Sequence, residues 1–351
     1  MACRECSQLC LKERLETAKV LISVPEREMI FSVQNALAGS DIQLTVSDRT
    51  IEFTTSAPEE LVRRLATESS LTDFQLKSVH VLVTEESSPL EFRMFRDVKT
   101  LYQYRSSTSS DDIAECLSAR RVESHYQPIV DLGNGQIHGF EALARGIRSD
   151  QSVISPLDLF KFADDNDAVF FLDRLTRETA IRTAAQLRLQ GRIFINFMPN
   201  AIYDPTQCLK TTFATAQEMN FDPSRIVFEV IETERVGDMD HLSYIFDYYR
   251  HHGFKVALDD VGSGYSGLNT LIDLKPDIIK IDREIISGID QNSMKQSIFC
   301  GLANAANKHQ ITVVAEGIET AEELEFVTAN GADLGQGYYF AKPAKDPIRS
   351  L

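Results

Sequence analysis

Acidic and amide side chains recur in the second part of the sequence at one kind of position, the carboxyl-terminal end of a short apolar run. In chain order they are Glu141, Asn196, Glu229, Glu232, Asp259, Asp260, Asp282, Glu316, Glu319 and Gln336, joined by Lys280. Any one of them alone is better explained as a strand-end residue that faces water. If the apolar runs are parallel strands, however, their ends meet on one rim, where so many like charges repel one another unless cations bind between them.

The chemistry available on such a rim is that of hard divalent cations. Its ligands are oxygen donors, with no His-x-His or cysteine pair nearby, and oxygen donors suit Mg²⁺ or Mn²⁺ better than zinc. Asp259 and Asp260 are adjacent in the sequence, and one carboxylate of such a pair can bridge two ions. The sequence therefore predicts a site for two Mg²⁺ or Mn²⁺ ions.

Eight segments that follow residue 112 are predicted to be strands and to position these side chains. They are residues 125–132, 137–143, 193–197, 226–231, 255–260, 278–281, 311–315 and 338–340. The first two flank the tight-turn sequence Gly133-Asn134-Gly135 and should pair antiparallel. Most of the others are separated by helix-length amphipathic segments, such as 173–190 and 241–252. Eight strands in about 240 residues favour a closed TIM-type (β/α)₈ barrel with its active site on the carboxyl-terminal rim.

The clearest composition break is residues 106–112, Ser-Ser-Thr-Ser-Ser-Asp-Asp, which we interpret as a linker between an N-terminal domain (1–105) and the barrel (113–351). The N-terminal domain is predicted to have the order βαββαβ of a small ferredoxin-like α+β fold with a regulatory role. Strands are expected at residues 19–24, 42–46, 51–55 and 74–83. Helices are expected at residues 26–38, from Pro58 onward, and near 91–104, where the last one connects to the barrel.

Seven short motifs follow one another in the predicted barrel. They are Gln127-Pro128-Ile129, Glu141-Ala142-Leu143-Ala144-Arg145, Phe228-Glu229-Val230-Ile231-Glu232, Asp259-Asp260-Val261-Gly262-Ser263-Gly264-Tyr265-Ser266, Lys280-Ile281-Asp282, Glu316-Gly317-Ile318-Glu319 and Gln336-Gly337-Tyr338. In this order, over residues 113–343, they resemble the EAL family of cyclic di-GMP phosphodiesterases. A Glu-Ala-Leu triplet alone would carry no information, but seven motifs in the family order are specific.

The resemblance implies an enzyme that hydrolyses one phosphodiester bond of cyclic di-GMP to linear 5′-pGpG with two divalent ions, in a barrel whose first strand is antiparallel. It places Glu141, Asn196, Glu229 and Asp259 around the first ion, and Asp259, Asp260 and Glu316 around the second. Gln127, Arg145 and Gln336 would contact the substrate, and Glu232 would stabilise the loop 261–266. Lys280, with Glu141 and Asp260, completes the expected catalytic set, as a base or as a group that positions water. The family resemblance also implies a homodimer formed through the barrel.

The sequence departs from the usual pattern of the family in three places. Gly146 stands where a tryptophan often follows the arginine, Phe197-Met198 replaces leucine-serine, and Val261 replaces a phenylalanine. None of these positions is an expected metal ligand. They concern the affinity for the ligand and the stiffness of the loop more than the chemistry.

Other interpretations of the sequence remain open at this point. Residues 262–267, Gly-Ser-Gly-Tyr-Ser-Gly, fit a dinucleotide-binding glycine pattern, although the two preceding aspartates would repel a pyrophosphate. Cys3, Cys6 and Cys10 in the N-terminal domain could form one face of a helix, bind zinc or an iron–sulfur centre, or act as a redox switch. The barrel itself could be a catalytically silent cyclic di-GMP receptor that signals through the N-terminal domain.

Charge and hydropathy limit the partners that we expect. The 351 residues carry a formal net charge of −16, which repels polyphosphates and argues against extended DNA or RNA as a partner. No apolar run is long enough to cross a membrane, and residues 1–16 lack the apolar core of a signal peptide. A cytoplasmic location is therefore expected.

Overall fold

The computed structural model describes residues 17–87, 89–106, 110–166, 168–231, 239–262 and 267–351. Cys3, Cys6, Cys10, Glu232 and the loop residues 263–266 lie outside the described residues. The chain divides into two compact units between Asp111 and Asp112. None of the helices in the described part of the chain is both long enough and apolar enough to cross a bilayer.

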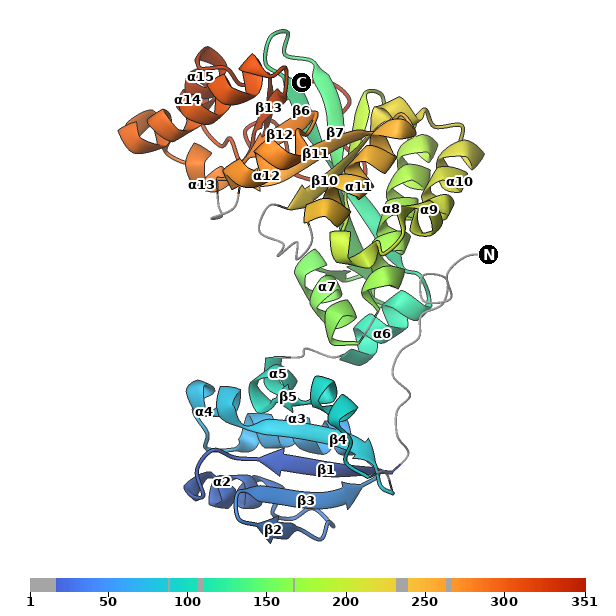
Figure 1. Cartoon of the computed structure of the whole chain (residues 1–351), viewed down its shortest axis with the longest axis vertical. Coiled ribbons are helices and arrows are strands. Elements are labelled where there is room, and N and C mark those ends of the chain that lie inside the picture. Colours follow the sequence, from blue (N-terminus) through green and yellow to red (C-terminus); the bar gives the residue numbers. More distant parts are fainter. Residues whose placement is uncertain (1–16, 88, 107–109, 167, 232–238, 263–266) are drawn as a thin grey trace. The chain divides into compact units, whose positions relative to one another are not determined.

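The N-terminal unit is a five-stranded antiparallel sheet with helices on one face (Figure 1). Its elements are β1 (Ala18–Ser23), α2 (Glu28–Leu37), β2 (Thr45–Ser47), β3 (Thr50–Thr55), α3 (Pro58–Glu68), α4 (Asp73–Ser78), β4 (His80–Glu85), the 3₁₀ helix η1 (Phe92–Asp97), β5 (Lys99–Thr100) and α5 (Leu101–Ser106). Strand β1 lies between β3 and β4 and is antiparallel to both, as the predicted α+β fold requires. Alternate β1 residues, Val20 and Ile22, point to the face that α2 and α3 cover, and the two helices bury Val33 and Leu65 there.

The structure corrects several element boundaries in this unit. Residues 74–83 were predicted to form one strand, but helix α4 occupies the first part and β4 begins only at His80. Thr72 explains the helix, because its hydroxyl accepts from the amide of Gln75 while the Gln75 side chain accepts from the amide of Thr72. The same reciprocal cap joins Thr100 to Gln103 and starts α5, so the helix predicted near 91–104 is replaced by η1, β5 and α5. The strand predicted at residues 42–46 also begins later, at Thr45.

Helix α6 (Ser110–Ser118) begins inside the segment 106–112 that was predicted to be entirely linker. Asp112 lies in its first turn, where a carboxylate complements the positive end of the helix dipole. Asp112 pairs with Arg148 at 3.5 Å, which ties the start of the helix to the barrel. The run of polar residues therefore includes a helix start, which composition alone does not distinguish from a flexible connector.

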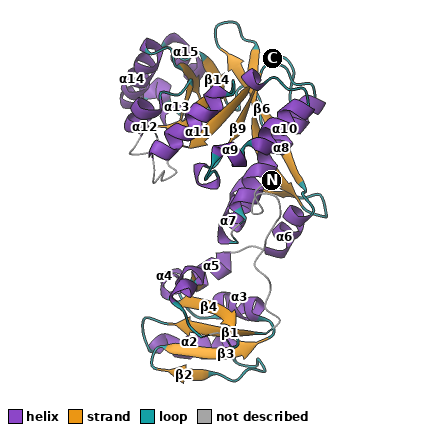
Figure 2. Ribbon diagram, turned by 45° about the vertical axis from the view of Figure 1, so that its right-hand side comes forward, coloured by secondary structure: helices purple, strands orange, loops and turns teal. Residues whose placement is uncertain are grey.

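The second unit is a closed eight-stranded barrel with helices on the outside (Figure 2). Its strands are β6 (Val122–Asp131), β7 (Ile137–Ile147), β9 (Arg192–Asn196), β10 (Ile226–Ile231), β11 (Lys255–Val261), β12 (Ile278–Ile281), β13 (Thr312–Ala315) and β14 (Leu334–Gln336), with the short β8 (Val153–Ile154) attached to β7. Strand β6 is antiparallel to both β7 and β14, whereas the remaining barrel neighbours are parallel. The predicted TIM-type barrel with an antiparallel first strand is confirmed.

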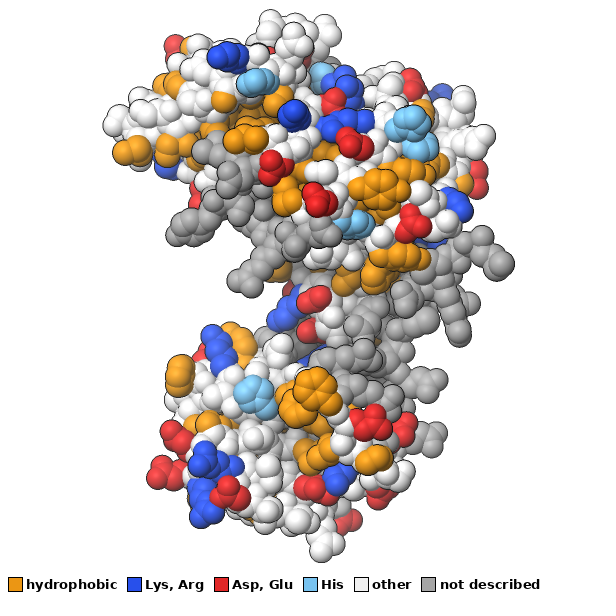
Figure 3. Space-filling view, viewed as in Figure 1, with side chains coloured by type: hydrophobic (Ala, Val, Ile, Leu, Met, Phe, Trp, Pro, Cys, Tyr) orange, Lys and Arg blue, Asp and Glu red, His pale blue; other side chains and the backbone are white. Residues whose placement is uncertain are grey.

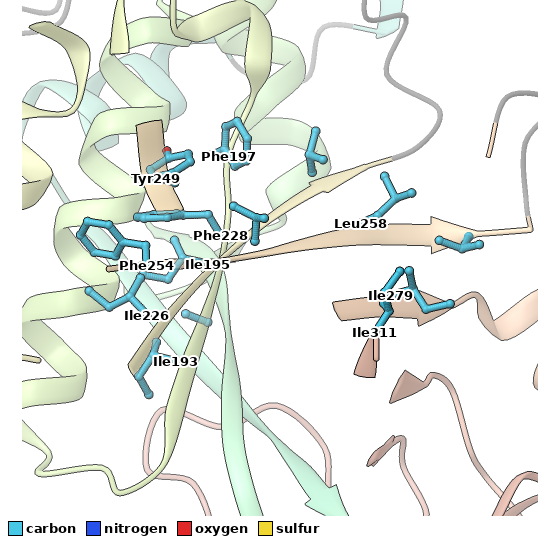
Figure 4. Packing of buried hydrophobic residues seen from close by; sticks show 14 of the residues in the cluster. Ile193, Ile195, Phe197, Ile226, Phe228, Tyr249, Phe254, Leu258, Ile279 and Ile311 are labelled. Atoms are coloured by element: carbon cyan, nitrogen blue, oxygen red, sulfur yellow. The ribbon is translucent and has the colours of Figure 1, made fainter. Parts of the chain in front are cut away.

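Helices connect the strands and cover them. They are α7 (Pro156–Asp165), α8 (Val169–Gln186), α9 (Pro205–Cys208), α10 (Lys210–Glu218), α11 (Met239–His251), α12 (Gly267–Leu274), α13 (Arg283–Ile286), α14 (Ser293–Lys308) and α15 (Ala321–Ala329), with the 3₁₀ turns η2 (Pro199–Ala201), η3 (Pro223–Arg225) and η4 (Ile289–Gln291). Outward-facing strand residues such as Ile195, Phe228 and Leu258 form the main core together with these helices (Figure 4). On the face of the described residues drawn in Figure 3, Lys and Arg are interspersed with Asp and Glu and form no continuous basic stripe.

The eighth strand is the one barrel element that the sequence placed wrongly. Residues 338–340 were predicted to form this strand, but Tyr338 and Tyr339 are exposed and the strand β14 ends at Gln336. Gly335 permits this register, because a Cβ there would lie 2.9 Å from the side chain of Leu132 and 3.0 Å from that of Ile318. Gln336 is therefore the last residue of the strand rather than a residue that precedes it.

Candidate functional site

A polar layer lies directly above an apolar layer inside the barrel. Seven strands each place one side chain in the apolar layer: Ile129, Phe194, Val227, Ala257, Ile278, Val314 and Leu334. Because strand side chains alternate between faces, a step of two residues toward the rim stays inside the barrel. That step reaches Gln127 on the antiparallel β6 and Asn196, Glu229, Asp259, Lys280, Glu316 and Gln336 on or just after the parallel strands. Glu141 on β7 is paired with Gln127.

Lys280 lies within ion-pair distance of four carboxylates in this layer. Its Nζ atom is 2.7 Å from Glu316 Oε1, 3.0 Å from Glu229 Oε1, 3.1 Å from Asp259 Oδ1 and 3.6 Å from Glu141 Oε2. Lys280 and Glu229 are completely buried. One ammonium cannot balance four ionised carboxylates, so full ionisation of the cluster would leave a large excess of negative charge in a place that water reaches poorly.

Amide side chains hold Glu141 from two sides. Gln336 Nε2 donates to Glu141 Oε2 at 2.6 Å and to Gln127 Oε1 at 3.0 Å, while Asn196 Nδ2 donates to Glu141 Oε1 at 3.0 Å. Gln127 is held in turn by a bond from its Nε2 to the carbonyl of Ala341. The first and last strands of the barrel are thus joined at the rim by a network of hydrogen bonds.

The crowding of charge appears directly in the acid–base properties of the cluster. Burial raises the pKa of Glu229 well above its usual value, Glu141 and Asp259 raise it further, and Lys280 only partly opposes them. The pKa of Glu316 is raised for the same reasons, burial first. Burial lowers the pKa of Lys280, but its four acidic neighbours together outweigh burial and hold that pKa well above its usual value. The amine of Lys280 is therefore an ammonium. The raised pKa values of Glu229 and Glu316 indicate that this single positive charge does not balance the acids around it.

Two groups of three carboxylates have the spacing that a metal ion requires. One oxygen from each of Glu141, Glu229 and Asp259 lies within 4.8 Å of the others, and the same holds for Asp259, Asp260 and Glu316. Asp259 belongs to both groups. Apart from the ion pair with Lys280, the carboxylate oxygens of Glu229 have no hydrogen-bond partner among the described residues. A buried, under-satisfied set of oxygen donors with excess negative charge fits divalent ions such as Mg²⁺ or Mn²⁺.

A backbone irregularity explains how two consecutive aspartates reach the same site. In a regular strand Asp259 and Asp260 would point to opposite faces, but the pairing of β11 with β12 shifts register between Leu258 and Val261. Asp260 has a left-handed φ of 56°, and its amide donates to Asp259 Oδ1 at 2.9 Å. Burial, with the nearby Asp259 and Asp282, raises the pKa of Asp260 to about 7.

The EAL domain family model matches residues 110–343, more than half of the chain. The chain belongs to the EAL domain family. Among curated proteins the EAL chain is 32% identical over 251 residues to the probable cyclic di-GMP phosphodiesterase PdeG of Escherichia coli K12, covering 69% of this chain and 48% of that protein. It is 30% identical over 237 residues to the cyclic di-GMP phosphodiesterase PdeR of the same organism, covering 66% and 35%. The chain therefore spans about half or less of the length of these relatives.

Solved structures agree with this assignment. A standalone EAL protein from Vibrio cholerae O395, in a c-di-GMP-bound form, is 38% identical with a TM-score of 0.59 and covers 66% of this chain and 94% of its own. Klebsiella pneumoniae BlrP1, at 23% identity and a TM-score of 0.60, covers 95% of this chain and 98% of its own. The second likeness concerns the fold alone, but it extends over the N-terminal unit as well as the EAL barrel.

Three further predicted rim residues of the EAL barrel belong to neither of the two carboxylate groups. Arg145 is half-buried on β7, four residues beyond Glu141, and its Nη1 donates to the carbonyl of Ala144 at 2.7 Å. Glu319 pairs with Arg283 at 3.0 Å and is not part of the cluster. Asp282 caps helix α13 and lies close enough to Asp260 to raise its pKa, a role that the sequence analysis did not assign. The dinucleotide interpretation of residues 262–267 is not supported, because these residues follow a strand of a closed barrel rather than of an open sheet.

Proposed function

We propose that this chain is a divalent-metal-dependent phosphodiesterase that hydrolyses one phosphodiester bond of cyclic di-GMP and releases linear 5′-pGpG. Membership of the EAL family and the names of the relatives support the substrate. The observation that carries the proposal is the layer of buried carboxylates around Lys280 on the carboxyl-terminal rim, where TIM-type barrels have their active sites. A receptor that only binds the ligand has no need for so concentrated a set of acids.

Two Mg²⁺ or Mn²⁺ ions would be held by the two carboxylate groups. Glu141, Asn196, Glu229 and Asp259 are the proposed ligands of one ion, and Asp259, Asp260 and Glu316 those of the other. Divalent ions supply Lewis acidity in such a site, because they lower the pKa of water and offset negative charge on a phosphate. The bulge at Asp260 and the hydrogen bonds to Glu141 fix the carboxylate directions before any ion arrives, which favours binding.

Lys280 is proposed to position the attacking water, and it forms the catalytic set together with Glu141 and Asp260. An ammonium donates hydrogen bonds but cannot accept a proton, so the raised pKa of Lys280 favours positioning over general-base action. Its complete burial and its contacts on several sides leave the ammonium little freedom to move. Lys280 would therefore hold the water in line with the phosphorus.

Substrate contacts are assigned to Gln127, Arg145 and Gln336. The guanidinium of Arg145 has five N–H donors in a planar fork that suits phosphate oxygens, and its half-buried position leaves part of it on the surface of the rim. Gln127 and Gln336 bind each other, so they would form one rigid wall of the substrate pocket. Glu232 is proposed to stabilise the loop 261–266, and a homodimer through the barrel completes the proposal.

The experiment is to incubate the purified chain with cyclic di-GMP and Mg²⁺ or Mn²⁺ and to separate the nucleotides by chromatography. We expect linear 5′-pGpG to appear, to require the metal, and to stop forming when EDTA is added. Binding of cyclic di-GMP without any product in either metal would refute the enzyme and favour the receptor.

A further inference from the structure

A second buried ionic cluster lies outside the carboxylate layer, on helix α8. Asp173 and Arg177 are each 1% exposed, and Arg177 Nη2 lies 2.9 Å from Asp173 Oδ2. They stand one helical turn apart, at i and i+4. A buried ion pair is weak evidence for stability, because removing two charges from water costs about as much as their attraction returns. What Asp173 contacts besides Arg177 is therefore the more informative observation.

Asp173 binds the chain immediately after strand β9. Its Oδ1 atom accepts a hydrogen bond of 2.9 Å from the amide of Met198, two residues beyond Asn196. The intervening Phe197 is fixed on its other side, because its amide donates to the carbonyl of Glu229 at 3.0 Å. The ring of Phe197 packs edge-on against Phe228 and Tyr249, with centroids 6.3 and 5.4 Å away (Figure 4).

We propose that Asp173, held by Arg177, is a positioning residue that fixes the end of β9 so that Asn196 meets Glu141. This inference rests on the proposed function, since it gives Asn196 a place in the metal site. The contact that Asp173 controls is the bond of 3.0 Å from Asn196 Nδ2 to Glu141 Oε1. Besides the bond to Met198, strand pairing, the bond from the Phe197 amide to Glu229 and the packing of the Phe197 ring restrain this strand end. Residues that orient metal ligands typically change metal affinity by about 10–100-fold when they are replaced.

Paired substitutions separate positioning from stability. Removing Asp173 alone would leave the buried charge of Arg177 unpaired and destabilise the fold for that reason. In Asp173→Asn/Arg177→Leu both charges are gone, but the asparagine oxygen can still accept from the Met198 amide. In Asp173→Leu/Arg177→Leu both charges and the acceptor are gone. The two double variants therefore differ in the hydrogen bond to Met198 and agree in the removal of the ion pair.

The test measures Mn²⁺ binding to the full chain by electron paramagnetic resonance, together with the melting temperature and the separate values of kcat and KM. We expect the leucine pair to lose about tenfold or more in Mn²⁺ affinity and to lower kcat more than it raises KM. The asparagine variant should retain nearly the wild-type affinity. Glu178→Ala is the matched control, because it breaks the ion pair of 2.6 Å with Arg174 on the same helix without reaching residues 196–198.

Three results would decide against the inference or support it further. A folded leucine pair with wild-type Mn²⁺ affinity would overturn it, and so would an equal loss of affinity in both double variants. If the leucine pair does not fold, Asp173→Ala/Arg177→Leu makes the same comparison with a smaller side chain. Adding Asn196→Ala to the leucine pair should cause no further loss beyond Asn196→Ala alone, because both changes act through the same ligand. Wild-type protein that binds no Mn²⁺ would instead refute the proposed function.

Discussion

Replacing Lys280 by methionine removes the ammonium that pairs with four carboxylates, and the consequence for stability can be worked out from the structure. The pKa of Lys280 is raised in the fold, so the charged lysine stabilises the protein at neutral pH and this stabilisation is lost only at strongly alkaline pH. Removing one partner of a buried ionic cluster costs about 3–5 kcal/mol. Since 1 kcal/mol shifts the melting temperature of a domain of this size by about 2–4 °C, metal-free Lys280→Met should melt about 6–20 °C lower than wild type.

Divalent ions should reverse much of this loss, because they supply positive charge to the same acids. We expect the difference in melting temperature between variant and wild type to shrink when saturating Mn²⁺ is added. The matched control is Lys255→Met, which breaks a lysine–aspartate pair of 2.6 Å with Asp277 on the same barrel, where the lysine is 43% exposed and the pair contributes little. An equal melting temperature of Lys280→Met and wild type without metal would refute the charge-balance argument.

The same variant separates chemistry from binding. If Lys280 positions the water, Lys280→Met should lower kcat by about 10²–10⁴-fold, the usual range for such participation. Its Kd for cyclic di-GMP, measured with Ca²⁺ to prevent turnover, should change little, because Arg145 and the amide side chains remain. A variant with full kcat would show that Lys280 plays no part in the chemical step.

Four further predictions follow from the site. Glu141→Ala should abolish turnover and lower the bound metal without changing the circular dichroism spectrum; wild-type hydrolysis with unchanged metal content would contradict the ligand assignment. Burial and the neighbouring acids raise the pKa of Asp260 to about 7, so Mn²⁺ affinity should rise between about pH 6 and 8 as the carboxyl ionises. The stability of the metal-free protein should fall as the pH rises from the usual pKa of 3.8 toward 7. Asp260→Asn should flatten both profiles. Ca²⁺ should inhibit hydrolysis, because its longer bonds and looser geometry misplace the water, and full activity with Ca²⁺ alone would be unexpected. A fragment that begins at Ser110, where α6 starts, should be soluble and should hydrolyse cyclic di-GMP, and an insoluble or inactive fragment would mean that the two units depend on each other.

The polar layer could be predicted from the sequence because its residues follow the two-residue alternation of strand side chains. If Val227 lies inside the barrel, Glu229 must lie inside it too, because it is two residues further along the same strand. The same holds for Ile278 and Lys280. The eighth strand failed this reasoning, since Tyr338 and Tyr339 are aromatic but exposed, while the true strand contains Gly335, a residue type that is depleted in strands. Helix α4 was missed although Thr72 and Gln75 have the spacing of a capping box.

Asp173 and Arg177 were outside the reach of sequence reasoning for a different reason. An aspartate and an arginine at i and i+4 on an amphipathic helix are the ordinary pattern of a solvent-exposed ion pair. Their burial depends on what packs over that helix face, including the ring of Tyr249 on α11, and no local pattern encodes it. The ion pairs of Lys280 likewise depend on five strands, β7 and β10 to β13, which must close into a barrel before the distances exist.

The bulge in β11 has a consequence for how the site tolerates insertions and deletions. Because the register shift turns Asp260 toward Asp259, the number of acids on the rim depends on the backbone as well as on side-chain identity. The two residues between Leu258 and Val261 are Asp259 and Asp260, so deleting Asp260 would restore regular alternation and leave Asp259 as the one inward-pointing aspartate of this strand. A point substitution such as Asp260→Ala removes the carboxylate and leaves the bulge in place, whereas this deletion would remove both and break up the group formed by Asp259, Asp260 and Glu316.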